Sequence, residues 1–207
     1  MSNEYLNKTE EQQFEDAKNW FKENGTPILV AIILACAASF GWNFWKNHQL
    51  ETAQKTSAAY QSVMESYLQN PSKNQPLIEK FIEDNKGSSY ATFAQLETAK
   101  QAVENGDFSA AKTTLQAVIA NNADLTLQNV ARFRLAQIDY QLKSYDEALA
   151  SLAQIQDKAW ELRKQILTGD ILAAKGDIPA AKVAYEQAKA NVTPQEQTLI
   201  DVRLNNL

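Results

Sequence analysis

The residue types that most often perform chemistry are scarce in this sequence. Its 207 residues include a single histidine, His48, and a single cysteine, Cys36. His48 lies beside a long apolar run, which argues against a histidine-based catalytic triad, and a zinc site would lack His and Cys ligands. Neither the GxxxxGK[ST] loop nor the GxGxxG turn occurs in the sequence. We therefore predict no catalytic residue, no metal site and no cofactor.

The charged residues indicate capping and binding more than catalysis. Asp107, Asp146 and Asp177 lie at similar turns, where aspartate is expected to cap a helix. Arg132 and Arg134 either hold an acidic or C-terminal peptide or lie on a solvated helix face. The formal net charge of −5 lacks the positive excess that nucleic-acid binding would need.

One apolar run, from Pro27 to Trp45, decides in which compartment the other residues act. As a helix at about 1.5 Å per residue it would span roughly 29 Å, close to the roughly 30 Å hydrocarbon core of a bilayer. Trp20 precedes the run, and Trp42 and Trp45 close it, as expected for aromatic residues at membrane interfaces. Pro27 suits the first helical position, where no N–H is needed. We predict an uncleaved transmembrane anchor over residues 27–45.

Other interpretations of this run remain open. A cleaved signal peptide would have a short basic leader, whereas residues 1–26 are mostly polar and acidic. A lipoprotein signal ending at Cys36 would have a small residue in place of Leu34 and a polar tether after the cysteine. A buried soluble helix would be unusually long and apolar on every face. The few flanking lysines do not set the orientation of the anchor.

Residues 1–26 form an acidic segment ahead of the anchor. Phe14, Trp20 and Phe21 would share one face of a short amphipathic helix. This helix either lies on the membrane surface or docks on a partner there, and a frayed tail is the alternative.

Residues 46–207 contain an internal repeat. Three segments align at offsets of 37 and 33 residues: "ENGDFSAAKTTLQAVIA", "LKSYDEALASLAQIQ" and "AKGDIPAAKVAYEQAKA". Each contains a small residue followed four positions later by a larger one: Ala111 and Leu115, Ala148 and Leu152, Ala181 and Tyr185. Twelve positions before each of these alanines stands another small residue: Ala99, Ala136, Gly169.

This pattern matches the helix–turn–helix unit of the tetratricopeptide repeat, whose period is about 34 residues. Small residues let two antiparallel helices approach closely, and larger ones fill the groove between them. We place the repeats near 92–125, 129–162 and 162–195. A long helix over 46–69, broken by Pro71 and Pro76, and a final helix from the Thr193 capping box flank them. The predicted fold class is all-α, with a single N-terminal transmembrane helix followed by an α-solenoid of tetratricopeptide-like helix pairs.

Stacked helix pairs offer a concave surface lined by the first helix of each pair. By repeat position, seven residues would line this candidate partner-binding groove: Leu96, Lys100, Phe133, Gln137, Tyr140, Ile166 and Asp170. Phe133 and Tyr140 are either aromatic anchors for a bound chain or core residues.

Several stretches, in order along the chain, give the sequence a family resemblance. They are "FKENG" before the anchor, "GW" near its end, "FRLAQIDYQLKSYDEALASL", "GDILAAKGDIPAAKVAYEQA" and the final "VTPQ…LNNL". Together with the acidic leader and one anchor, the chain resembles the YfgM family, ancillary subunits of the bacterial SecYEG translocon. Cys36 has no role that this family would assign.

The resemblance implies a bacterial inner-membrane protein with a cytoplasmic N-terminus and a periplasmic repeat domain. It implies SecYEG and the periplasmic chaperone PpiD as partners in helping exported polypeptides. It also implies restraint of the Rcs response regulator. We therefore expect a non-enzymatic periplasmic scaffold or co-chaperone. The alternative is a stress-response regulator that acts through its cytoplasmic segment.

Overall fold

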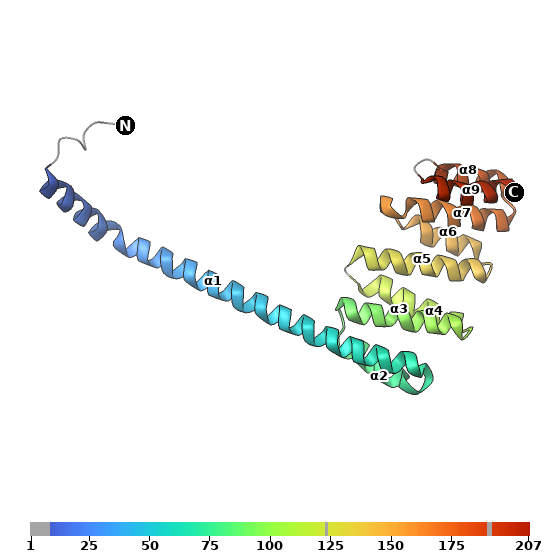
Figure 1. The fold of residues 1–207 in the computed structure, drawn as a ribbon, viewed down its shortest axis with the longest axis horizontal. Helices are drawn as coiled ribbons and strands as arrows, with labels where there is room; N and C mark the ends of the chain where they lie inside the picture. The colour runs from blue at the N-terminus through green and yellow to red at the C-terminus, as the bar shows by residue number, and fades with distance from the viewer. Residues whose placement is uncertain (1–8, 123, 190–191) are drawn as a thin grey trace. The chain divides into compact units, whose positions relative to one another are not determined.

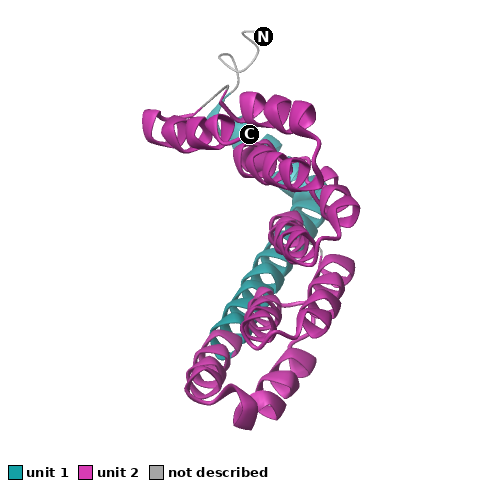
Figure 2. Cartoon of the chain, turned by 90° about the vertical axis from the view of Figure 1, so that its right-hand side faces the viewer, with its two compact units in different colours: residues 1–55 teal, residues 56–207 magenta. Residues whose placement is uncertain are grey.

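The computed structural model describes residues 9–122, 124–189 and 192–207, and all regular structure in these ranges is helical. This confirms the predicted all-α fold class. The chain divides into two compact units, residues 1–55 and residues 56–207, which Figure 2 draws in teal and magenta.

Unit 1 consists of the first part of α1, the helix Glu10–Gln69 (Figure 1). Within the described residues, α1 is the one helix long and apolar enough to cross a membrane. Large side chains of its apolar run, such as Leu34 and Phe40, are exposed, and the rings of Trp42 and Trp45 lie 5.3 Å apart near the end of the run. These findings agree with the predicted single N-terminal membrane-spanning helix.

The predicted start of the anchor helix at Pro27 is wrong. The helix begins at Glu10 and continues through Pro27. Proline lacks an N–H, so the helix forgoes one bond to the carbonyl of Glu23, while the bonds on either side hold it together. The amphipathic helix predicted within residues 1–26 is therefore the first part of α1, and residues 1–8 lie outside the described residues.

Unit 2 is built from helix pairs that follow one another in space (Figures 1 and 2). The end of α1 packs against α2 through one apolar cluster that includes Tyr67 and Phe81. The other elements, in order, are α2 (Pro71–Asp84), α3 (Ser89–Glu104), α4 (Phe108–Asn121), α5 (Leu125–Gln141), α6 (Tyr145–Ala153), η2 (Lys158–Trp160), α7 (Glu161–Lys175), α8 (Ile178–Ala188) and α9 (Pro194–Asn205).

Pro71 ends the long helix as predicted, but Pro76 does not break the next one. Helix α2 begins at Pro71 and contains Pro76. The Asn70 side chain accepts a hydrogen bond from the Lys73 N–H at 3.1 Å and so caps the helix. Because Pro76 lies near this capped end, α2 forgoes one backbone bond there and continues.

The small and large positions of the repeat are buried as the sequence predicts. All six small residues are buried: Ala99, Ala111, Ala136, Ala148, Gly169 and Ala181. The larger partners Leu115, Leu152 and Tyr185 are exposed by 1%, 1% and 3%. In each repeat, the two small residues and the larger one are therefore buried between the paired helices and hold them close together.

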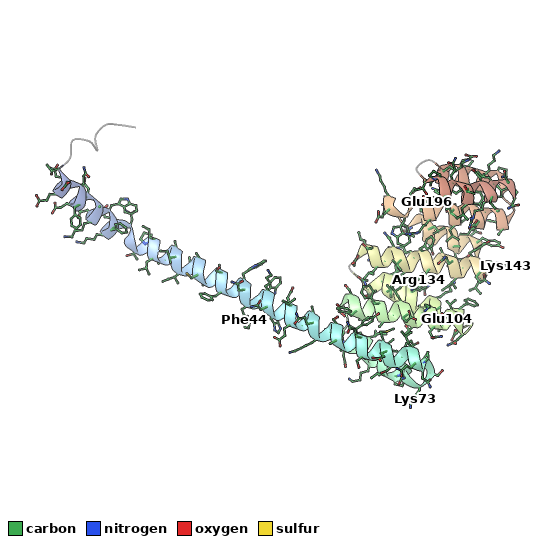
Figure 3. The ribbon with its side chains drawn as sticks, viewed as in Figure 1. Phe44, Lys73, Glu104, Arg134, Lys143 and Glu196 are labelled. Atoms are coloured by element: carbon green, nitrogen blue, oxygen red, sulfur yellow. The ribbon has the colours of Figure 1, made fainter. Side chains whose placement is uncertain are left out.

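The three repeats share one turn between their paired helices. Gly106, Lys143 and Gly176 occupy it with φ of 79°, 62° and 92°, in the left-handed region. Lys143 is the exception in residue type, because only glycine adopts this conformation without steric cost. Figure 3 labels Lys143 at the end of α5.

Two of the three turn aspartates cap helices as predicted. Asp107 and Asp177 accept hydrogen bonds from the N–H groups of Ala110 and Ala180, at 2.9 and 3.1 Å. The capping prediction for Asp146 is wrong. Asp146 lies inside the first turn of α6 and pairs with Lys175.

Candidate partner-binding groove

Helices α3, α5, α7 and α9 meet in succession along the face predicted to bind a partner. We call the region between α3 and α5 the first junction, that between α5 and α7 the second junction, and that between α7 and α9 the third junction. Helices α3, α5 and α7 are the first helices of the three repeats and supply equivalent residues to the three junctions. The junctions can therefore be compared at these positions, although α9 lies outside the repeats.

The first junction holds an open hollow with a volume of about 610 Å³. Its floor is apolar and comes from Ala99, Phe108, Leu115 and Ile138, and Val103 of α3 lines it as well. The volume lies within the roughly 300–1,000 Å³ range of ligand pockets, which are usually apolar with a few polar groups.

The rim of the hollow carries polar and charged side chains from two helices. Helix α3 supplies Lys100 and Glu104, and α5 supplies Arg134, Gln137 and Gln141. Figure 3 labels Arg134 on α5 and Glu104 on α3. Two of the seven predicted groove residues, Lys100 and Gln137, therefore meet at one site.

The two cations at this rim contact groups of the same chain, Lys100 two glutamates and Arg134 a backbone carbonyl. Lys100 Nζ donates to Glu97 at 2.9 Å and lies 3.7 Å from Glu104. The hydrogen bond with Glu97 raises the pKa of the Lys100 ammonium, and the charges of both glutamates add to the effect. Arg134 donates from Nη1 to the carbonyl of Leu96 at 3.0 Å and so ties α5 to α3.

Leu96 does not line the hollow. It is 7% exposed and belongs to the apolar core beneath the first junction. Its contribution to the site comes through its carbonyl, which accepts from Arg134.

The second junction is filled by aromatic rings. Tyr140 and Tyr145 occupy the positions of Val103 and Phe108 one repeat later, and their ring centroids lie 6.2 Å apart. Both pack against the buried cluster of this repeat. Burial, followed by the negative charge of Asp170, raises the pKa of Tyr140.

Phe133 lies at the outer end of the second junction. Its ring packs 5.4 Å from that of Trp160, and the guanidinium of Arg163 lies 5.7 Å from the Trp160 centroid. Phe133 and Tyr140 are both half-buried, so each packs against the core with part of its surface and exposes the rest.

The third junction is closed by the C-terminal helix α9. The Tyr185 hydroxyl donates to Asp170 at 2.7 Å, and Arg203 Nε of α9 donates to the same carboxylate oxygen at 2.9 Å. Ile166 packs in the cluster around Ile200 of α9. The predicted groove residues Ile166 and Asp170 are therefore engaged by the chain's own last helix.

Burial, and then the hydrogen bond with Asp170, raises the pKa of Tyr185 well above its usual value. The Tyr185 ring also fills the space beside Gly169, where an added Cβ would lie 2.4 Å from a ring carbon. Glycine is required there by the ring and not by the backbone conformation.

Other residues that line the hollow, Val103 and Gln141 among them, were not predicted. Comparing Val103 with Tyr140 at the 37-residue offset reveals a small side chain where the next repeat has a large one. Arg203 had no such signal, since it lies beyond the repeats. Within residues 9–122, 124–189 and 192–207, no group of three or more His, Cys, Asp or Glu residues is arranged to hold a metal ion.

This fold and groove define a helical-repeat protein with a candidate membrane span. The family model of a tetratricopeptide repeat-like domain matches residues 18–207.

Comparison with similar proteins identifies a family within this class of helical-repeat proteins. An ancillary SecYEG translocon subunit of Aggregatibacter actinomycetemcomitans is 41% identical over 198 residues, covering 96% of this chain and 97% of that protein. Proteins of the same name from Haemophilus influenzae (strain ATCC 51907 / DSM 11121 / KW20 / Rd) and Escherichia coli (strain K12) are 40% and 35% identical, covering 96% of this chain and 97% and 96% of those proteins. The chain belongs to the family of ancillary SecYEG translocon subunits.

Proposed function

We propose that the chain is a membrane-anchored, non-enzymatic scaffold that associates with the SecYEG translocon. The main support is that the likeness to proteins named ancillary SecYEG translocon subunits covers the candidate span and the repeat unit together, over 96% of the chain. Tethering at the membrane would raise the effective concentration of the repeat unit for partners at the same membrane.

In this proposal the chain crosses the bacterial inner membrane once. The acidic segment 1–26 is cytoplasmic, 27–45 is the anchor and the repeat domain 46–207 is periplasmic. Protease added to intact spheroplasts tests this orientation. Residues 46–207 should be digested, and their protection would overturn the periplasmic assignment.

The groove would serve as the contact for the periplasmic chaperone PpiD or for exported polypeptides. Gln137 is the best-placed probe, because it is exposed and lines the hollow of the first junction. A photoreactive residue at position 137 should yield adducts with the translocon, the chaperone or exported chains in native membranes.

The matched control is a photoreactive residue at Gln116, which is exposed on α4 and does not line the hollow. Fewer partner adducts are expected from position 116. Equal adducts from both positions, or none from position 137, would count against partner binding through the groove.

A second candidate is a regulatory role for the cytoplasmic segment, acting on the Rcs response regulator. The observation in its favour is that Phe14, Trp20 and Phe21 are all more than half exposed near the start of α1. Deleting residues 2–22 separates the two functions. The scaffold function predicts that translocon capture survives this deletion, whereas the regulatory function predicts that signalling changes.

A further inference from the structure

The first junction is open because its repeat has a smaller residue at one position. Val103 lines the hollow, whereas Tyr140, one repeat later, places a ring at the equivalent position of the second junction. The neighbouring positions are alike, since Leu115 and Ile138 correspond to Leu152 and Ile171. The polar rim differs as well, since Gln137 and Gln141 correspond to Asp170 and Ala174. Among the apolar lining positions, the main difference in size is the one between Val103 and Tyr140.

The lining of the hollow fits an apolar side chain. Phe108, Leu115 and Ile138 give it a floor without charge, so an apolar group placed there would leave water without burying an unpaired polar group. Lys100 forms ion pairs with Glu97 and Glu104, and Arg134 donates to a neutral carbonyl and keeps its charge. The two cations and two carboxylates at the rim sum to no net charge, so the rim does not select a charged ligand.

Two amides stand beside this apolar floor. Gln137 and Gln141 lie one helical turn apart on α5 and both line the hollow. Among the residues that the structure describes, neither side chain makes a hydrogen bond. Each amide can both donate and accept, which suits it to the N–H and C=O groups of an extended backbone.

We propose that the hollow of the first junction anchors one bulky apolar side chain, of the size of Leu or Phe, from an extended and uncharged segment of an exported polypeptide. The side chain enters between Val103 and Ile138, and the amides of Gln137 and Gln141 bind the adjoining backbone. This inference rests on the proposed function, in which exported chains reach the groove. To that function it adds the chemical class of the bound segment, and it assigns the binding to the first junction.

The test uses the full-length chain in lipid nanodiscs and a heptapeptide, Gly-Ser-Gln-photoleucine-Gln-Ser-Gly, with blocked ends. Irradiation should give adducts that mass spectrometry maps to residues lining the hollow. An unlabelled peptide with a central Leu should compete, and one with a central Ser should not. Adducts that map outside the hollow would overturn the proposal.

Val103→Tyr is the decisive variant, because it copies the filled state of the second junction. It should lower the adduct yield about tenfold by occupying the space that the peptide needs. An unchanged yield in a folded Val103→Tyr protein would overturn the proposal. Tyr140→Val is the reciprocal variant and should produce new adducts between α5 and α7.

The double substitution Gln137→Ala with Gln141→Ala keeps the test decisive if Val103→Tyr does not fold. Both glutamines are exposed, so their removal leaves the core intact and should lower the adduct yield about threefold through lost hydrogen bonds. An unchanged yield would overturn the proposal, in which these amides bind the backbone of the segment.

Co-purification of the translocon from membranes reports on the proposed function separately. Val103→Tyr should lose the peptide adduct and keep translocon association. If the wild-type chain captures no translocon, the proposed function fails, while the peptide adducts still decide whether the hollow binds apolar segments.

Discussion

The first and third junctions share their framework and differ in what fills it. At the first junction, Val103 leaves an open hollow with free amides at its rim. At the third junction, Tyr185, Asp170 and Arg203 form a hydrogen-bonded group that seats α9 on the last repeat. In this unit the helix pairs repeat, and side chains that differ between the repeats accompany the difference between an open junction and one that the chain itself closes.

The strongest test of the closed junction is Ile200→Ala. Ile200 is fully buried between α9 and the last repeat, so its truncation should lower the free energy of unfolding by about 2–4 kcal/mol. Hydrogen exchange should rise in α9 and stay unchanged in α3 and α5. Leu199→Ala is the matched control, because Leu199 is 53% exposed, and it should change little. Equal effects of the two substitutions would mean that α9 does not close the junction.

A smaller effect is expected from Gly169→Ala. The new methyl group would meet the Tyr185 ring, and such overpacking costs about 1–3 kcal/mol, measurable by denaturant unfolding. The same substitution should cost less in a Tyr185→Leu background, since the other repeats pair alanine with leucine at these positions. A double-mutant cycle without coupling would contradict the packing described for the third junction.

Alkaline pH should weaken the closed junction before the open one. Burial and the bond to Asp170 raise the folded-state pKa of Tyr185, while the unfolded chain keeps a value of about 10. The unfolded state therefore releases this proton first, so the contribution to stability is complete below about pH 10 and is lost as pH rises above it. Tyr185→Phe should flatten this part of the pH profile of unfolding. A variant profile parallel to that of the wild type would contradict the assignment.

The smallest expected effect is a gain from Lys143→Gly. Lys143 has φ of 62° where the other repeats have glycine, and relieving this conformation should raise the free energy of unfolding by about 0.5–1 kcal/mol. Thermal unfolding measures the gain, and Lys143→Ala, which keeps the strain, should give none. Because Lys143 lies in the turn after α5, the peptide adducts at the first junction should be unaffected.

The sequence predicted the parts of this fold that depend on short spacings. Ala111 with Leu115, and their counterparts in the next two repeats, lie as the repeat requires because a helix fixes which side chains share a face. The ends of helices were harder to predict where the sequence has proline. Pro27 and Pro76 both lie inside helices, since a helix held by its neighbouring bonds can lose one donor.

The groove was only partly predictable for a different reason. Lys100 and Gln137, assigned to one face by repeat position, both line the hollow, but repeat position could not show that α9 would return to engage Asp170. That contact joins residues 33 positions apart, Asp170 and Arg203, and Arg203 belongs to no repeat. Long-range pairs of this kind carry no periodic signal.

Gly169 and Tyr185 stand where the other two repeats have alanine and leucine, and this difference has a consequence for adding further repeats after the third. Tandem duplication of the last repeat would copy a glycine and a tyrosine whose hydroxyl partner, Asp170, is shared with an arginine supplied once, by α9. An inner copy would keep the missing methyl group and lose the arginine that balances its carboxylate. The contacts of Gly169, Tyr185 and Asp170 therefore suit a repeat that is followed by α9, and they would not be satisfied in a repeat followed by another copy of itself.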